Sequence, residues 1–154
     1  MKYIILIITL LSPIFVSAQL KLGGKGQVRH SDIHLPKAYF EDIQNSGEGD
    51  KNADFRKVKL PPQSEGDMSV TIVNPYNAKI RFAYSTSDIM RVVEMEPYSF
   101  WSGIANDYWQ NFIIRTKDKN LTYSLKTNHC YTIFWDKGMK VWNVKPLKCG
   151  MYKD

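Results

Sequence analysis

Short β-type segments, separated by turn signals, follow one another between residues 67 and 147. Within residues 79–85, Ile80, Phe82 and Tyr84 alternate with residues on the opposite face of the segment. Alternation with a period of two residues places one face of the segment towards a core and the other towards solvent, which is typical of a half-buried strand. Patterns of this kind predict strands at residues 68–74, 79–85, 90–95, 111–116, 121–126, 129–136 and 139–145.

Turn residues mark the limits of these strands. Asn74-Pro75-Tyr76-Asn77 follows the first, and Asp136-Lys137-Gly138 joins the last two in the clearest hairpin of the chain. About seven short strands with no sustained helical period predict an all-β fold, a small antiparallel β-sandwich. An immunoglobulin-like strand order is our first expectation, and a small barrel is the alternative.

The N-terminus has the features of a secretory signal peptide. Lys2 precedes an unbroken apolar run at residues 3–11, and Val16-Ser17-Ala18 supplies the small residues of a cleavage site. Residues 1–18 are therefore expected to be removed; the alternative is an uncleaved membrane anchor, for which the apolar run is short. We expect an exported protein, periplasmic by default or extracellular, with no membrane span after signal cleavage.

Residues 19–66 differ in composition from the strand-rich part. They contain Gly23-Gly24-Lys25-Gly26 and Pro61-Pro62, and they show no sustained apolar period. We predict an extended or partly disordered N-terminal arm at 19–66, followed by a β-sandwich domain at 67–154. Within the arm, only a short helical turn at 38–43 and an edge strand at 55–60 are expected.

The chain is basic, but its basic residues are dispersed. It has 21 Lys and Arg against 15 Asp and Glu, a net charge of +6. Proteins that bind nucleic acid usually concentrate basic residues on one element, so we expect no nucleic-acid partner. Attraction to anionic envelope polymers or to an acidic partner is left open, beside the simpler interpretation of a surface that favours solubility.

Cys130 and Cys149 are the two cysteines, and both lie near the C-terminus. An exported protein meets an oxidising compartment, which favours a disulfide between them. Two free thiols, or an intermolecular bridge from Cys149, are the alternatives.

An aromatic cluster between residues 98 and 112 is the most unusual stretch of the chain. Its rings can fill one end of the sandwich, anchor a protein partner or stack on sugars beside amide and carboxylate groups. The candidate binding residues are Tyr98, Phe100, Trp101, Asn106, Asp107, Tyr108 and Trp109.

Metal and catalytic motifs are incomplete. His30 and His34 lack an evident third ligand, and residues 50–54 match only the first part of a calcium loop. We therefore expect no metal or other cofactor. A hydrolase built on Glu94, Glu96 or Asp107 would need a deep pocket with a carboxylate of raised pKa, and we predict a protein that is not an enzyme.

These observations predict an exported, non-enzymatic protein-interaction module of the cell envelope, in the class of structural subunits, inhibitors and immunity-type proteins. Its expected partner is an envelope or secreted protein. The alternative is a carbohydrate- or peptidoglycan-binding module that uses the loop at 98–112. An interface requires a contiguous exposed apolar patch, whereas a glycan site requires an indole that lies open on the surface.

Overall fold

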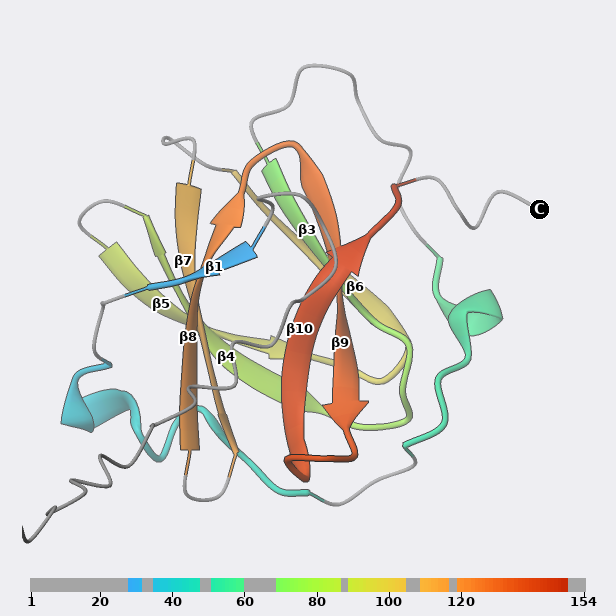
Figure 1. The fold of residues 1–154 in the computed structure, drawn as a ribbon, viewed down its shortest axis with the longest axis horizontal. Helices are drawn as coiled ribbons and strands as arrows, with labels where there is room; N and C mark the ends of the chain where they lie inside the picture. The colour runs from blue at the N-terminus through green and yellow to red at the C-terminus, as the bar shows by residue number, and fades with distance from the viewer. Residues whose placement is uncertain are drawn as a thin grey trace, which may run out of the picture.

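Two β-sheets packed face to face form the protein (Figure 1). The structure is a computed structural model, and it describes residues 28–31, 35–47, 51–59, 69–86, 89–104, 109–116 and 119–149. Its strands are β1 (Val28–His30), β2 (Gln44–Asn45), β3 (Ser69–Asn74), β4 (Ile80–Thr86), β5 (Ile89–Met95), β6 (Ser99–Ile104), β7 (Trp109–Thr116), β8 (Lys119–Lys126), β9 (His129–Asp136) and β10 (Val141–Leu147). Two short 3-10 helices, η1 (Lys37–Tyr39) and η2 (Phe55–Lys57), lie between the early strands.

Five strands of the six-stranded sheet follow the order β1-β8-β7-β4-β5, and the sixth, β2, pairs in parallel with β7 outside this order. The four-stranded sheet has the order β10-β9-β3-β6. The predicted all-β sandwich is confirmed. Its strand order differs from the immunoglobulin arrangement, in which both sheets are antiparallel. Here β3 and β4 lie in different sheets, and β3 pairs in parallel with β9.

The connection at residues 75–79 explains this difference. It carries the chain from one sheet to the other and does not close a hairpin. The buried Asn74 side chain holds it, because its Nδ2 donates to the carbonyl oxygens of Ala78 and Glu96 at 2.7 and 3.0 Å. Tyr76 is buried within the same connection and contacts Trp142 edge to face, with ring centroids 5.0 Å apart.

Two predictions of local structure were wrong. Residues 99–104 form β6 and are not part of a loop, so the described chain has eight strands between residues 69 and 147. The segment at 55–60, predicted as an edge strand, instead begins with η2. The Asp54 side chain caps this helix by accepting a hydrogen bond from the Arg56 backbone N–H, which favours a helical turn over an extended chain.

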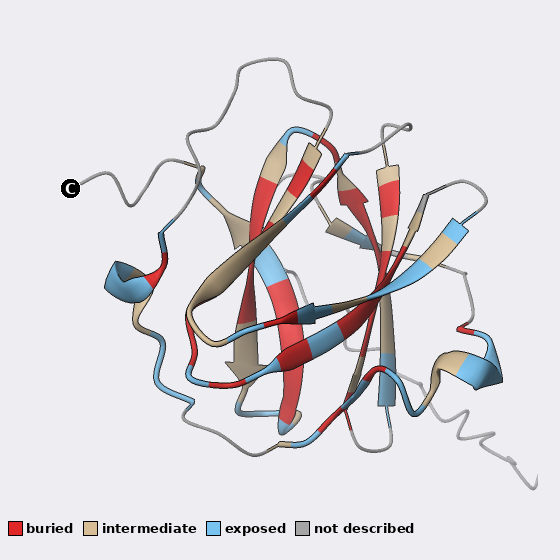
Figure 2. Ribbon diagram, turned by 180° about the vertical axis from the view of Figure 1, so that it is seen from behind, coloured by how far each residue is buried: buried red, intermediate tan, exposed pale blue. Residues whose placement is uncertain are grey.

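The main core lies between the two sheets, where buried residues cover the facing sides of the strands (Figure 2). Trp142 and Tyr131 are its largest fully buried side chains. Full burial of such a side chain contributes about 1.5–3 kcal/mol to the free energy of unfolding.

A second, smaller core lies on the outer face of the six-stranded sheet. Leu35 and Ile43, from the segment expected to be an arm, pack there against Ala83 and Ile113. In addition, β1 pairs with β8 and β2 pairs with β7. The described parts of residues 28–47 therefore lie on the sandwich. The expected signal peptide lies outside the described residues.

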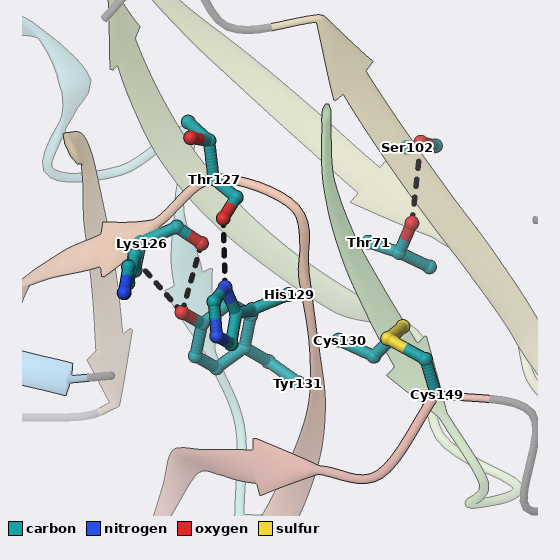
Figure 3. The surroundings of a disulfide bond; sticks show 8 residues. All are labelled: Thr71, Ser102, Lys126, Thr127, His129, Cys130, Tyr131 and Cys149. Atoms are coloured by element: carbon teal, nitrogen blue, oxygen red, sulfur yellow. Dashed lines mark hydrogen bonds between the residues drawn. A yellow bond between two sulfur atoms is a disulfide. The ribbon is translucent and has the colours of Figure 1, made fainter. Parts of the chain in front are cut away.

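The predicted disulfide between Cys130 and Cys149 is confirmed (Figure 3). It joins the start of β9 to the segment that follows β10. Next to it, the Tyr131 hydroxyl accepts a hydrogen bond from the Lys126 backbone N–H and donates one to the Lys126 carbonyl oxygen, at 2.8 and 3.0 Å. The disulfide thus closes the open end of the β9–β10 hairpin, and the Tyr131 hydrogen bonds tie the start of β9 to the end of β8. In the described part of the chain, no helix is long and apolar enough to cross a membrane.

Candidate functional site

The structure separates the aromatic residues that the sequence groups together. Phe100 and Trp101 lie on β6 in the four-stranded sheet, whereas Trp109 and Phe112 lie on β7 in the other sheet. Phe112 is fully buried. Three further candidates, Asn106, Asp107 and Tyr108, lie outside the described residues. The described rings therefore form no single binding surface.

Trp101 points between the two sheets. Its indole contacts the rings of Phe82 and Tyr84 edge to face, with centroids 5.3 and 4.7 Å apart. Gly103 makes this position possible, because a Cβ atom there would lie only 2.2 Å from the Trp101 ring. Trp101 thus packs against the main core, as the structural interpretation of the aromatic cluster predicted.

None of the four tryptophans, all of which are described, presents the open indole that sugar stacking requires. Trp142 is fully buried, and Trp101 packs as stated above. The Arg29 guanidinium lies 4.1 Å from the Trp109 ring centroid, and the Lys51 ammonium lies 4.0 Å from that of Trp135. Among the other candidates, Tyr98 is half-buried, and the Lys57 ammonium lies 4.6 Å from its ring.

Exposed apolar side chains concentrate instead on β5 and β6. The large hydrophobic residues that are exposed in the described chain are Ile89, Val92 and Ile104, at 54%, 37% and 81% exposure. The strands β5 and β6 are edge strands of different sheets, joined by the short turn at 96–98. All the exposed large hydrophobic residues therefore lie on two consecutive edge strands.

A hydrogen bond ties the end of β6 to β4, the neighbour of β5. The Tyr84 hydroxyl donates to the Ile104 carbonyl oxygen at 2.9 Å, and Tyr84 lies opposite Arg91 in the β4–β5 register. Burial raises the pKa of Tyr84, so its hydroxyl remains a donor at neutral pH. We refer to the two edge strands β5 and β6, which carry Ile89, Val92 and Ile104, as the β5–β6 side.

The backbone of β5 is regular and paired on one edge. Its seven residues all pair with β4, and its sequence contains neither proline nor glycine. No described strand pairs with its other edge. The six-residue β6 is likewise unpaired on its outer edge by any described strand, whereas β1 has only three residues and β10 contains Pro146, which has no N–H to donate.

An ion-pair network lies at the far end of β5. Lys79 pairs with Glu94 and Glu96 at 2.9 and 3.0 Å, and Arg81 pairs with Glu94. Hydrogen bonds donated by Lys79 and Arg81 lower the pKa of Glu94, and donation to Glu94 and Glu96 raises the pKa of Lys79. A general acid needs a carboxyl of raised pKa, so Glu94 does not have the character that the hydrolase hypothesis requires.

A hollow of about 400 Å³ lies over residues 52–57 and Tyr98. Its one carboxylate, Asp54, pairs with both Arg56 and Lys57, at 3.2 and 3.8 Å. The Arg56 side chain lowers the pKa of Asp54 by hydrogen bonding. The same carboxylate accepts the backbone hydrogen bond that caps η2.

Within the described ranges, no group of three or more His, Cys, Asp or Glu side chains could hold a metal ion. His34 and Asp50, from the two metal motifs considered above, lie outside those ranges.

Sequence reasoning missed the three exposed apolar residues. Ile89 and Val92 belong to a segment of mostly apolar residues that gives no alternation, so the pattern does not indicate which side chains are exposed. Ile104 follows Gly103 in a stretch interpreted as loop. Comparison of the chain with protein-family models, with curated proteins and with solved structures found no match in any of the three.

Proposed function

We propose that the protein is an exported, non-enzymatic interaction module of the cell envelope, and that its β5–β6 side binds an extended segment of another envelope or secreted protein. One observation carries this proposal. The longest proline-free strand edge left unpaired in the described chain, that of β5, carries two of its three exposed large hydrophobic residues, and the third lies on β6, the next edge strand.

The chemistry of this side suits strand addition. An incoming segment placed beside β5 would pair with the free N–H and C=O groups of its outer edge, which supplies affinity independent of sequence. Ile89 and Val92 point to opposite faces of the sheet, so the segment would meet an apolar contact on each face. Ile104 extends the apolar contact onto the second sheet. Such contacts exclude water and supply specificity.

The proposed export has two supports. The signal-peptide pattern at residues 1–18 is the first. The second is the disulfide between Cys130 and Cys149, since disulfides persist mainly in oxidising compartments.

Site-specific photo-crosslinking in the native host tests the proposal. A photoreactive amino acid is placed at Val92 or at Ile104, and, as controls, at the exposed Lys37 or Lys119. We expect the same protein to be crosslinked from both Val92 and Ile104 and from neither control. Crosslinks that form equally at the control positions, or that contain no protein, would refute the assignment.

A matched pair of substitutions distinguishes strand addition from non-specific hydrophobic association. Val92→Lys introduces a charge on the edge strand, whereas Val92→Thr keeps a β-branched side chain of similar size. We expect Val92→Lys to lose the crosslink formed from Ile104 and Val92→Thr to retain it, with both variants unfolding at temperatures close to that of the wild type. Retention of the crosslink in Val92→Lys would place the interface elsewhere.

A further inference from the structure

We propose that the segment that adds to β5 carries an acidic residue directly opposite Arg91, with an apolar residue two positions before it and another two positions after it. This inference rests on the proposed function, because it names the chemistry of the strand that the β5 edge selects. Arg91 lies within β5, and its side chain is exposed. An added strand therefore places one of its own residues beside this cation.

Arg91 is the charged side chain of β5 that has no opposite charge beside it. The other charged residue of the strand, Glu94, pairs with Lys79 and Arg81. Arg91, in contrast, forms no ion pair with any described residue. A strand added to this edge takes part of the guanidinium out of water, which is unfavourable when no partner replaces the water. A carboxylate opposite the cation supplies that partner, and a second cation there is repelled.

The β4–β5 register identifies the side chains that share a face of the sheet with Arg91. Arg91 lies opposite Tyr84, and Val93 lies opposite Phe82. Both Tyr84 and Phe82 are buried in the main core. Because directly opposite residues share a face, and so do alternate residues of one strand, Ile89, Arg91 and Val93 all lie on the core face of β5. The cation is thus flanked along its own face by two apolar residues.

The pattern of the complementary segment follows from this face. When one residue of the segment lies opposite Arg91, the residues two positions away on either side share its face and lie beside Ile89 and Val93. The matching order is apolar, any residue, acidic, any residue, apolar. This order is the same in both directions along the chain. It therefore holds whether the added strand runs parallel or antiparallel to β5.

The β5 strand of a second copy does not supply this pattern. Glu94 is three positions from Arg91, so the two side chains point to opposite faces of the sheet. Two antiparallel copies of one strand that are related by a two-fold axis keep the same face on the same side. Glu94 of one copy would therefore not meet Arg91 of the other. Pairing of two β5 edges leaves both arginines without a carboxylate, and we assign the acidic segment to another protein.

A charged residue on an edge strand can also act only as protection against unwanted pairing. The two roles of Arg91 differ in their consequences. A purely protective arginine disfavours every added strand, and its removal strengthens the binding of all of them. A selecting arginine favours the strand that carries an acid at the matching position, and its removal weakens the binding of that strand.

Titration of the purified protein with four end-capped peptides, followed by the NMR shifts of its backbone amides, separates these roles. The first peptide is Ser-Val-Thr-Glu-Thr-Val-Ser, and two others carry Gln or Lys at the central position. The fourth, Ser-Val-Glu-Thr-Thr-Val-Ser, has the composition of the first, but its acid is out of phase with one valine.

We expect the first peptide to bind with a Kd about fivefold lower than that of the Gln peptide, and to shift the amides of residues 89–95 most. The Lys peptide and the out-of-phase peptide should bind more weakly than the first. Equal binding of the Glu and Gln peptides would overturn the inference. Binding of none of the four at millimolar concentration, or shifts centred on another strand, would overturn it as well.

Charge reversal with a matched control tests the role of Arg91 itself. Arg91→Glu should reverse the preference, so that the Lys peptide binds about fivefold more tightly than the Glu peptide. Lys119→Glu makes the same change of net charge at an exposed position on β8 and should keep the wild-type preference. The same reversal in both variants would show attraction to the net charge of the protein. Arg91→Met should lose the preference, and tighter binding of all four peptides by this variant would show a purely protective arginine. Either result would overturn the inference.

Failure of this inference and failure of the proposed function give different results. If the crosslink from Ile104 is lost in Arg91→Glu and retained in Lys119→Glu, with both variants folded by their thermal unfolding temperatures, the inference is supported. If the crosslink persists in Arg91→Glu, the proposed interface stands and the acidic partner residue is refuted. If the wild type forms no crosslink, the proposed function fails, and the peptide titration still decides whether the β5 edge selects an acidic strand.

Discussion

Substitution of Asn45 should destabilise the protein more than any other single polar change in residues 28–47. Asn45 is 3% exposed and lies where β4 and β7 separate. Arg81 and Arg115 would form the next pair of that ladder, but the Asn45 side chain lies between them. Its Oδ1 accepts from the Arg81 N–H at 2.7 Å, and its Nδ2 donates to the carbonyl oxygens of Arg81 and Arg115 at 2.6 and 2.9 Å.

The expected decrease in the free energy of unfolding follows from the groups that lose a hydrogen-bond partner. Asn45→Ala removes the acceptor of the Arg81 N–H and the two N–H donors of an amide whose Nδ2 also lies 3.1 Å from the Ile43 carbonyl oxygen, so about three hydrogen bonds are lost. At about 1 kcal/mol for each net hydrogen bond, the free energy of unfolding should fall by about 3 kcal/mol, and by more where water cannot reach the groups. Asn45→Asp keeps the acceptor but directs a carboxylate oxygen at two carbonyl oxygens. We therefore expect it to be at least as destabilising at neutral pH and to recover partly when acid protonates the carboxylate.

Urea unfolding followed by circular dichroism measures the effect. Gln44→Ala is the matched control, because Gln44 precedes Asn45 in β2 and its side chain is exposed and accepts a hydrogen bond from Arg115. We expect the control to lower the free energy of unfolding by less than about 1 kcal/mol. If Asn45→Ala costs no more than Gln44→Ala, the inference that this amide substitutes for the missing strand pair is wrong.

Three further predictions concern other contacts. Reduction of the disulfide between Cys130 and Cys149, 19 residues apart, should lower the free energy of unfolding by about 3 kcal/mol, measured by urea unfolding with and without reductant. Gly103→Ala should cost about 1–3 kcal/mol and change the tryptophan emission, because the new methyl group meets the Trp101 ring; an unchanged spectrum and stability would contradict the packing. Burial raises the pKa of Tyr131 well above its usual value near 10, so ionisation favours the unfolded chain. The contribution of Tyr131 to the free energy of unfolding should be fully present below about pH 10 and should fall above it. Tyr131→Phe should make this fall with pH less steep. At neutral pH the variant should be about 2 kcal/mol less stable, because it lacks the two hydrogen bonds with Lys126.

The sequence predicted the fold class because its strands carry a local signal. Ile80, Phe82 and Tyr84 alternate with residues on the other face, and all three are buried on the core side of β4. The disulfide could also be predicted, because two cysteines in a chain expected to be exported leave few alternatives. Both inferences depend on features contained within one segment or one pair of residues.

Strand order and the role of the arm could not be predicted, because they depend on contacts between distant segments. Nothing in residues 69–74 indicates that β3 pairs in parallel with β9. The polar Asn45 resembles an ordinary turn residue, yet it is buried between two strands that follow much later. The candidate site was missed for a related reason: exposure of Ile104 is a property of the assembled edge and not of its neighbours in sequence.

The arrangement of partners along the chain also constrains when the protein can fold. Trp142, in the last strand, donates a hydrogen bond to the Ser46 carbonyl oxygen 96 residues earlier, and Thr132 of β9 bonds to Val73 of β3 across 59 residues. Such separations raise the entropic cost of forming the first native contacts and slow folding. A chain that leaves its site of synthesis or translocation from the N-terminus therefore remains without its main core until the final hairpin emerges.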